Sequence, residues 1–242
     1  MSDNSFSRRN FIKISGVGAI TAASLNLGGM LSIPEALADE SKRPQNADEA
    51  LKALMEGNKR FVNSLKKGPG RSSKRRKELA AGQNPFVSIL ACADSRVAPE
   101  IIFDQGLGDL FVVSVAGIIV NFTNYGIQGS LEYGALVLGT PLIMVLGHSE
   151  CGAVAAAIES LQKDTQFPGS INDIAQSIEP AVEKAKAEKG NLLLNSIISN
   201  VQMGVNKLNN SDPVISDLVK KGKVKVVGAN YDLKTGEVKL IS

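Results

Sequence analysis

Short apolar runs of strand length alternate with segments of helix length along most of this chain. The runs lie at 86–91, 110–115, 142–146 and 224–227. A strand that is apolar at consecutive positions is buried on both faces, and helices between such strands make the crossovers that join parallel strands. We therefore predict an α/β fold with a mostly parallel central sheet flanked by helices, and an edge strand at 237–241.

Segments with helical spacing of apolar residues fill the intervals between the predicted strands. They lie at 48–61, 125–138, 152–162, 171–188, 191–208 and 213–220, and a further short helix is expected after the basic run at 71–77. The long apolar stretch at 131–147 is divided by Glu132, Gly139 and Pro141. It therefore predicts a helix, a turn and a strand, and not a membrane span.

The N-terminal segment has the pattern of an export signal. A pair of arginines, Arg8 and Arg9, precedes a weakly apolar stretch at 14–33, and an Ala-x-Ala site ends at Ala38. This order resembles a twin-arginine signal, so we predict that residues 1–38 direct export to the periplasm and are then removed. The alternative is an uncleaved membrane anchor, which the glycines in the stretch and the Ala-x-Ala site disfavour. Because twin-arginine export carries folded proteins, the signal also suggests a cofactor inserted before export.

The remaining chain predicts a tether at 39–46 and one domain at 47–242, because 242 residues with 43% hydrophobic composition supply a large core and show no internal repeat. The 27 Lys and Arg residues against 24 Asp and Glu residues give a formal charge of +3, too balanced to indicate a nucleic-acid partner. The basic run at 71–77 has no interleaved aromatic residues, so we interpret it as a solvated face or a subunit contact. We expect no nucleic-acid partner, and a membrane contact only through an uncleaved signal.

Chemically reactive side chains follow two of the predicted strands at the point where each strand ends. Cys92 directly follows the strand at 86–91, and His148 and Cys151 come just after the strand at 142–146. The carboxyl ends of parallel strands meet at one edge of a sheet, where ligands of α/β proteins bind. If the two strands are neighbours, the three side chains meet, and two thiolates with one imidazole are typical ligands of zinc. Three protein ligands leave a fourth position open, as in a catalytic zinc site.

Further residues beside these ligands complete the predicted site. Asp94 could occupy the fourth metal position, whereas a bidentate pair with Arg96 would hold it away and leave that position to water. Gly152 permits close approach of a backbone N–H at the start of a helix. The residues alone leave three alternatives open. The two cysteines could be ordinary buried core residues, or they could form a disulfide with each other. One of them could instead be a catalytic nucleophile, for which His148 would be the only histidine available as a base.

Two motifs resemble the signatures of β-class carbonic anhydrases: Cys-Ala-Asp-Ser-Arg at 92–96 and Gly-His-Ser-Glu-Cys-Gly at 147–152. The resemblance extends from about residue 50 to the C-terminus. It implies the same α/β fold, at least a homodimer in which N-terminal helices embrace the partner, and one Zn²⁺ bound by Cys92, His148 and Cys151. It also implies that Asp94 and Arg96 form a catalytic dyad, with Asp94 as a possible fourth ligand in a closed form.

The resemblance implies roles for residues outside the two motifs as well. Gln83, Phe111 and Tyr133 match substrate-pocket residues of the plant-like branch of the family, and Gly152 matches its backbone contact to substrate. From the sequence alone, Phe111 and Tyr133 are more typical of core aromatic residues at strand and helix positions.

The function that the resemblance implies is the reversible hydration of carbon dioxide to bicarbonate and a proton. Ser114 and Ile118 depart from the pattern, because the family commonly has arginine and asparagine at these positions. This departure motivates one alternative, a zinc-binding homologue that binds bicarbonate with little turnover. Another alternative is a hydrolase of carbon disulfide or carbonyl sulfide that uses the same site. With His148 assigned to zinc, no second histidine can shuttle protons, so buffer or water must carry them.

Overall fold

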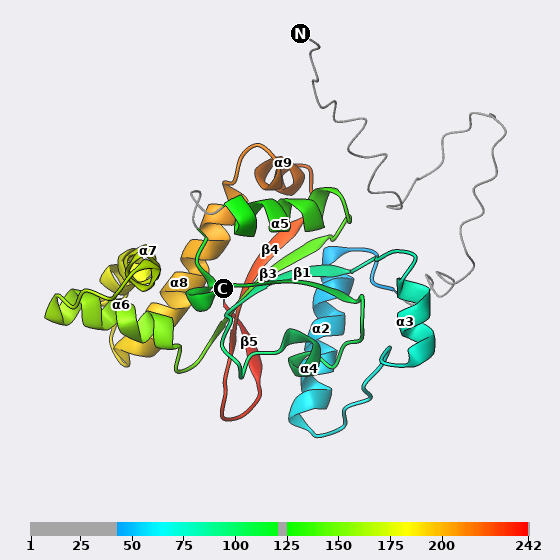
Figure 1. Ribbon diagram of the computed structural model, residues 1–242, viewed down its shortest axis with the longest axis horizontal. Coiled ribbons are helices and arrows are strands. Elements are labelled where there is room, and N and C mark those ends of the chain that lie inside the picture. Colours follow the sequence, from blue (N-terminus) through cyan, green and yellow to red (C-terminus); the bar gives the residue numbers. More distant parts are fainter. Residues whose placement is uncertain (1–42, 121–124, 242) are drawn as a thin grey trace, which may run out of the picture.

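The computed structural model describes residues 43–120 and 125–241, and Figure 1 shows their arrangement. These residues form a five-stranded sheet in the order β2-β1-β3-β4-β5. The strands are β1 (Val87–Ala91), β2 (Leu110–Ser114), β3 (Leu142–His148), β4 (Lys225–Tyr231) and β5 (Val238–Ile241). Strands β1 to β4 are parallel, and β5 pairs antiparallel with β4 at the edge. The predicted α/β fold with a mostly parallel sheet is confirmed.

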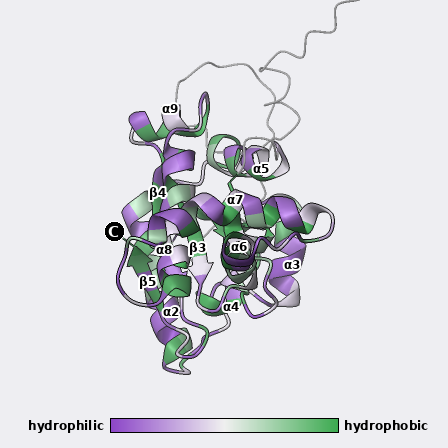
Figure 2. Cartoon of the chain, turned by 90° about the vertical axis from the view of Figure 1, so that its left-hand side faces the viewer, coloured by the Kyte–Doolittle hydropathy of each residue, from purple (hydrophilic) through white to green (hydrophobic). Residues whose placement is uncertain are grey.

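Helices cover both faces of the sheet. They are α2 (Ala47–Val62), α3 (Ser73–Leu79), α4 (Pro99–Ile102), α5 (Tyr125–Leu136), α6 (Gly152–Lys163), α7 (Ser170–Ala185), α8 (Leu192–Asn209) and α9 (Ile215–Lys220). Along β3, Leu142, Met144 and Leu146 join the core that contains residues of α2 and α4. Ile143 and Val145 join the core formed with α5 to α9. Burial on both faces explains the consecutive apolar residues of β1 and β3, whereas the equally apolar β2 lies at the edge of the sheet and is only partly buried. Figure 2 shows that the helices around the sheet carry both hydrophilic and hydrophobic residues.

Two strands are longer than the sequence predicted, and close helix packing is the reason. The predicted strands stop before Gly147 and Gly228, but β3 and β4 run through these glycines to His148 and Tyr231. A Cβ on Gly147 would lie 2.6 Å from Val201 of α8, and a Cβ on Gly228 would lie 2.8 Å from the same side chain. The two glycines therefore allow α8 to approach the sheet and do not end the strands.

The predicted export signal at 1–38 and the first part of the tether at 39–46 lie outside the described residues. Helix α2 begins at Ala47, after Asn46, whose side chain accepts a 2.9 Å hydrogen bond from the N–H of Glu49. Two short elements are not among those predicted from the sequence, α4 and the 3₁₀ turn η3 (Ala116–Ile118). In the part of the chain that the structure describes, no helix is both long enough and apolar enough to cross a membrane.

Candidate metal centre

Three potential metal ligands converge at the carboxyl edge of the sheet. Cys92 directly follows β1, His148 is the last residue of β3, and Cys151 immediately precedes α6. Strands β1 and β3 are neighbours, so their carboxyl ends lie side by side as predicted. One ligand atom from each residue lies within 4.8 Å of the other two, and all three residues are buried. Both cysteines are free thiols, so this structure does not contain the alternative disulfide.

The imidazole of His148 is oriented by a backbone contact. Its Nδ1 lies 2.9 Å from the carbonyl oxygen of Ser149, an acceptor, so the ring proton is assigned to Nδ1. Nε2 is then an acceptor, and it is buried with no hydrogen-bond partner among the described residues. A buried acceptor without a partner costs free energy, and a metal ion beside the two sulfur atoms would satisfy it. His148 therefore has the tautomer and the orphaned nitrogen that a metal ligand needs.

The loop between β3 and α6 is fixed to the end of β4. The N–H of Ser149 donates to the carbonyl of Tyr231 at 2.9 Å, and the Ser149 hydroxyl oxygen accepts from the N–H of Leu233 at 2.9 Å. Glu150 follows in the left-handed region with φ of 54°. This tight turn brings Cys151 back to the edge of the sheet where His148 ends β3.

The two cysteines have opposite pKa shifts. Hydrogen bonds from the Cys151 thiol and from the N–H groups of Gly117 and Asp94 outweigh burial and hold the pKa of Cys92 well below its usual value. Donation to Cys92, together with burial, raises the pKa of Cys151. Burial alone would lower the pKa of His148, but the neighbouring Cys92 thiolate raises it. Two adjacent thiolates ionise together only beside a positive charge, which a divalent cation supplies.

Arg96 binds both carboxylate oxygens of Asp94. The backbone N–H and Nε of Arg96 donate to Oδ1 at 2.9 Å, and Nη2 donates to Oδ2 at 2.7 Å. These contacts hold the pKa of Asp94 well below its usual range, so the carboxylate is ionised at neutral pH. Oδ2 lies 3.9 Å from Nε2 of His148. The carboxylate is therefore adjacent to the three potential ligands while Arg96 restrains it.

The segment after β2 contacts the same cluster through its backbone. The N–H of Gly117 donates a 3.4 Å hydrogen bond to Sγ of Cys92. Ser114 is exposed at the end of β2 and pairs with Ala91, while Ile118 is buried with a left-handed φ of 49°. A β-branched residue is strained in this conformation, so packing around Ile118 must hold it there. The two departures from the family pattern thus flank Gly117 and leave the potential ligands in place.

Three of the predicted substrate residues lie away from the cluster of their own chain. Gln83 is exposed and precedes β1, whereas Cys92 follows β1, so a strand with a rise of about 3.3 Å per residue separates them. Phe111 pairs with Ser88 near the start of β1, and its ring centroid lies 6.1 Å from that of Tyr133 in α5. The structure therefore places Phe111 and Tyr133 in contact with each other toward the opposite end of the strands, the end at which Gln83 precedes β1.

Gly152, by contrast, lies beside the cluster. It is the first residue of α6 and directly follows Cys151. It is exposed, and a Cβ at this position would have no neighbour within 4 Å. The space next to its backbone is therefore open to a ligand.

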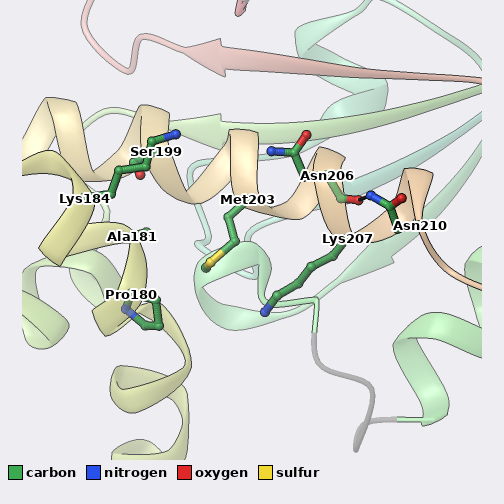
Figure 3. Close-up of a pocket in the computed structure, with 8 residues that line it drawn as sticks. All are labelled: Pro180, Ala181, Lys184, Ser199, Met203, Asn206, Lys207 and Asn210. Atoms are coloured by element: carbon green, nitrogen blue, oxygen red, sulfur yellow. Dashed lines mark hydrogen bonds between the residues drawn. The ribbon is translucent and has the colours of Figure 1, made fainter.

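A separate cavity of about 470 Å³ lies between α7 and α8 (Figure 3). Its lining consists of Pro180, Ala181, Lys184, Ser199, Met203, Asn206, Lys207 and Asn210. None of the site residues predicted from the sequence belongs to it.

The converging side chains fit a zinc ion. Two cysteine sulfurs and one imidazole nitrogen form a donor set found in catalytic zinc sites, where a fourth position stays open. The buried, orphaned Nε2 of His148 supports this fit. Fold and cluster together define an α/β protein with a candidate three-ligand zinc site at the carboxyl edge of a parallel sheet.

Comparison with known proteins identifies the family. The family model described as carbonic anhydrase matches residues 87–238. "Carbonic anhydrase 2" of Mycobacterium tuberculosis is 40% identical over 195 residues, which cover 81% of this chain and 93% of that protein. The β-carbonic anhydrase CcaA superposes with a TM-score of 0.64 at 26% identity, covering 79% of this chain and 95% of that chain. A tetrameric β-carbonic anhydrase of Sordaria macrospora shares the fold, with a TM-score of 0.64 at 23% identity over 79% of this chain and 96% of that chain. The chain belongs to the β-carbonic anhydrase family.

Proposed function

We propose that this protein is a zinc-dependent enzyme that interconverts carbon dioxide and bicarbonate. The observation that carries the proposal is the convergence of Cys92, His148 and Cys151 next to a carboxylate that Arg96 restrains, in a chain of the β-carbonic anhydrase family. Zinc bound by these three side chains would lower the pKa of a water molecule toward neutrality and so supply the nucleophile.

Asp94 orients the reacting water in this proposal. Its low pKa keeps it ionised, so it can only accept hydrogen bonds. Arg96 contacts both carboxylate oxygens and thereby fixes the direction of their free lone pairs. The Arg96 side chain is 55% exposed and that of Asp94 is 17% exposed, so the dyad connects the buried ligands with solvent. Because His148 is used as a ligand, the released proton passes to water or buffer on this side.

A direct test compares three substrates on one zinc-loaded sample. We expect rapid hydration of carbon dioxide, little hydrolysis of carbonyl sulfide or carbon disulfide, and loss of activity when a chelator removes the zinc. Activity that survives complete zinc removal would contradict the proposal. Faster turnover of either sulfur compound than of carbon dioxide would replace it by the hydrolase alternative.

Gln83, Phe111 and Tyr133 serve the site of a partner subunit in this proposal, and the active protein is at least a homodimer. The support is geometric: these residues lie toward the opposite end of the strands from the cluster of their own chain. A symmetric dimer allows such an exchange, because each protomer presents the same surface to the other.

Mixed dimers test the exchange. A protomer with Gln83→Ala keeps its ligands, whereas a protomer with Cys151→Ser lacks one ligand but supplies Gln83. If Gln83 acts on the partner, a purified dimer of these two protomers contains one complete site and recovers about half of the unsubstituted activity. If Gln83 acts on its own chain, the mixed dimer is as inactive as its parents.

We also propose that residues 1–38 direct export to the periplasm by the twin-arginine route. The support is the sequence order of Arg8, Arg9, a weakly apolar stretch and an Ala-x-Ala site. Protein recovered from the periplasm of an expressing bacterium should begin at Asp39, and replacing both arginines by lysine should retain the chain in the cytoplasm. Periplasmic protein that still carries its first residues would contradict cleavage, and export of the lysine variant would contradict the route.

A further inference from the structure

A buried asparagine of α8 contacts the loop that hydrogen-bonds Cys92. Asn200 is 3% exposed, and its Nδ2 donates a 2.8 Å hydrogen bond to the carbonyl of Gly117. The N–H of the same glycine donates to Sγ of Cys92 at 3.4 Å. A continuous path of two hydrogen bonds therefore links α8 to one of the potential zinc ligands.

The backbone conformation of Gly117 directs its N–H toward Cys92 and its carbonyl toward Asn200. Its φ of 72° and ψ of 12° lie in the left-handed region, so its N–H and its carbonyl have directions that a right-handed residue would not give. A Cβ here would lie 2.6 Å from Cδ1 of Ile178 and 3.0 Å from Cβ of Ala153. The backbone of Gly117 is thus packed against α6 and α7 while Asn200 holds it from α8.

A second side chain of α8 contacts the same segment three residues after Gly117. Nζ of Lys207, shown in Figure 3, donates a 3.0 Å hydrogen bond to the carbonyl of Val120. Helix α8 thus holds the loop at two carbonyl groups, that of Gly117 through Asn200 and that of Val120 through Lys207. Of the two contacts, only the one from Asn200 involves Gly117, the residue that hydrogen-bonds Sγ of Cys92.

We propose that Asn200 is a positioning residue for the Cys92 thiolate, acting through the backbone of Gly117. By holding the Gly117 carbonyl, Asn200 keeps the adjacent N–H directed at the sulfur. An N–H···S hydrogen bond withdraws negative charge from a thiolate and fixes the direction of its remaining lone pairs, which sets how the sulfur binds a metal. The inference rests on the proposed zinc function and adds a residue that neither signature motif contains.

Three variants separate positioning from packing. Asn200→Ala removes the amide donor, and Asn200→Ser replaces it by a hydroxyl that can also donate and that fits a helix already carrying buried serines at 196 and 199. Ser199→Ala is the matched control, because Ser199 is adjacent, 2% exposed, and its hydroxyl has no hydrogen-bond partner among the described residues. The full chain is used for all variants, and thermal unfolding confirms that each is folded.

The main readout is the charge-transfer absorption from thiolate to metal after Co²⁺ replaces Zn²⁺. Loss of a hydrogen bond leaves more charge on the sulfur, so the band of Asn200→Ala should move to longer wavelength. The affinity for zinc, measured by competition with a chromophoric chelator, should fall about 10- to 100-fold, the range typical of lost outer contacts to metal ligands. Asn200→Ser should restore part of both properties, and Ser199→Ala should match the unsubstituted protein.

Two results would overturn the inference: a folded Asn200→Ala protein with an unchanged cobalt spectrum, or a Ser199→Ala protein with the same changes as Asn200→Ala. Neither measurement needs carbon dioxide turnover. A protein that binds zinc without hydrating carbon dioxide would therefore refute the proposed function and leave the positioning role to be decided by the spectrum. A protein that takes up neither zinc nor cobalt would refute both.

Discussion

Replacing Gly117 by alanine tests how tightly the loop beside Cys92 is packed. Two costs add in this variant. Alanine at a φ of 72° costs about 1 kcal/mol more than glycine. A Cβ placed 2.6 Å from Ile178 and 3.0 Å from Ala153 forces the core to shift, which typically costs about 1–3 kcal/mol. The expected loss is therefore about 2–4 kcal/mol, which is less than the roughly 5–15 kcal/mol of a typical domain, so the variant should still fold.

Gly139→Ala is the matched control for this experiment. Gly139 has a φ of 69°, but a Cβ there would have no neighbour within 4 Å, so only the conformational cost of about 1 kcal/mol applies. Urea unfolding of metal-free protein, followed by far-UV circular dichroism at one protein concentration, gives the free energy of unfolding of each variant. Equal losses in the two variants would refute the argument that the backbone of Gly117 is tightly enclosed.

Three further substitutions test the site and one ion pair. Cys151→Ser should lose bound zinc and carbon dioxide hydration together, measured as metal per chain and initial rate; full activity in this variant would overturn the ligand assignment. Asp94→Asn should keep zinc and lose turnover, because the amide cannot replace the ionised acceptor; zinc loss equal to that of Cys151→Ser would show that Asp94 has a different role. Asp104 is a buried carboxylate that Arg60 contacts at 2.7 Å; burial alone would raise its pKa, but Arg60 and two backbone N–H groups lower it. Its ionised form stabilises the fold above the unfolded-state pKa of about 3.9, and this stability is lost as the pH falls through the lower folded-state pKa. Asp104→Asn should therefore destabilise the protein more at about pH 7 than at about pH 2 in urea unfolding, and an equal loss at both values would contradict the shift.

The convergence of Cys92, His148 and Cys151 was predictable because it follows from the apolar pattern of the strands. Each residue comes at the end of an apolar run, and the carboxyl ends of parallel strands share one edge. The sequence does not state that β1 and β3 are neighbours, which the structure shows. The positions of Gly147 and Gly228 misled the prediction of strand ends, because only the tertiary structure reveals that α8 needs the space of their missing side chains.

The contacts around Gly117 could not be predicted from local patterns. Asn200 and Gly117 are 83 positions apart and meet only because α8 packs across the loop that follows β2. An asparagine within a helix gives no local signal of such a contact. The resemblance to known sequences likewise assigns Gln83 to a substrate pocket, but it does not indicate whether that pocket belongs to the same chain or to a partner subunit. Its position before β1, away from the ligands of its own chain, is what supports the proposed role in a partner subunit.

The most direct test of the central claim is a zinc titration of metal-free protein followed by stopped-flow hydration of carbon dioxide. The account predicts that the rate rises in proportion to bound zinc and reaches its plateau at one zinc per chain. Such a result would also show that Ser114 and Ile118 are compatible with catalysis. A protein that binds one zinc per chain and does not hydrate carbon dioxide would contradict the claim and favour a role in binding bicarbonate.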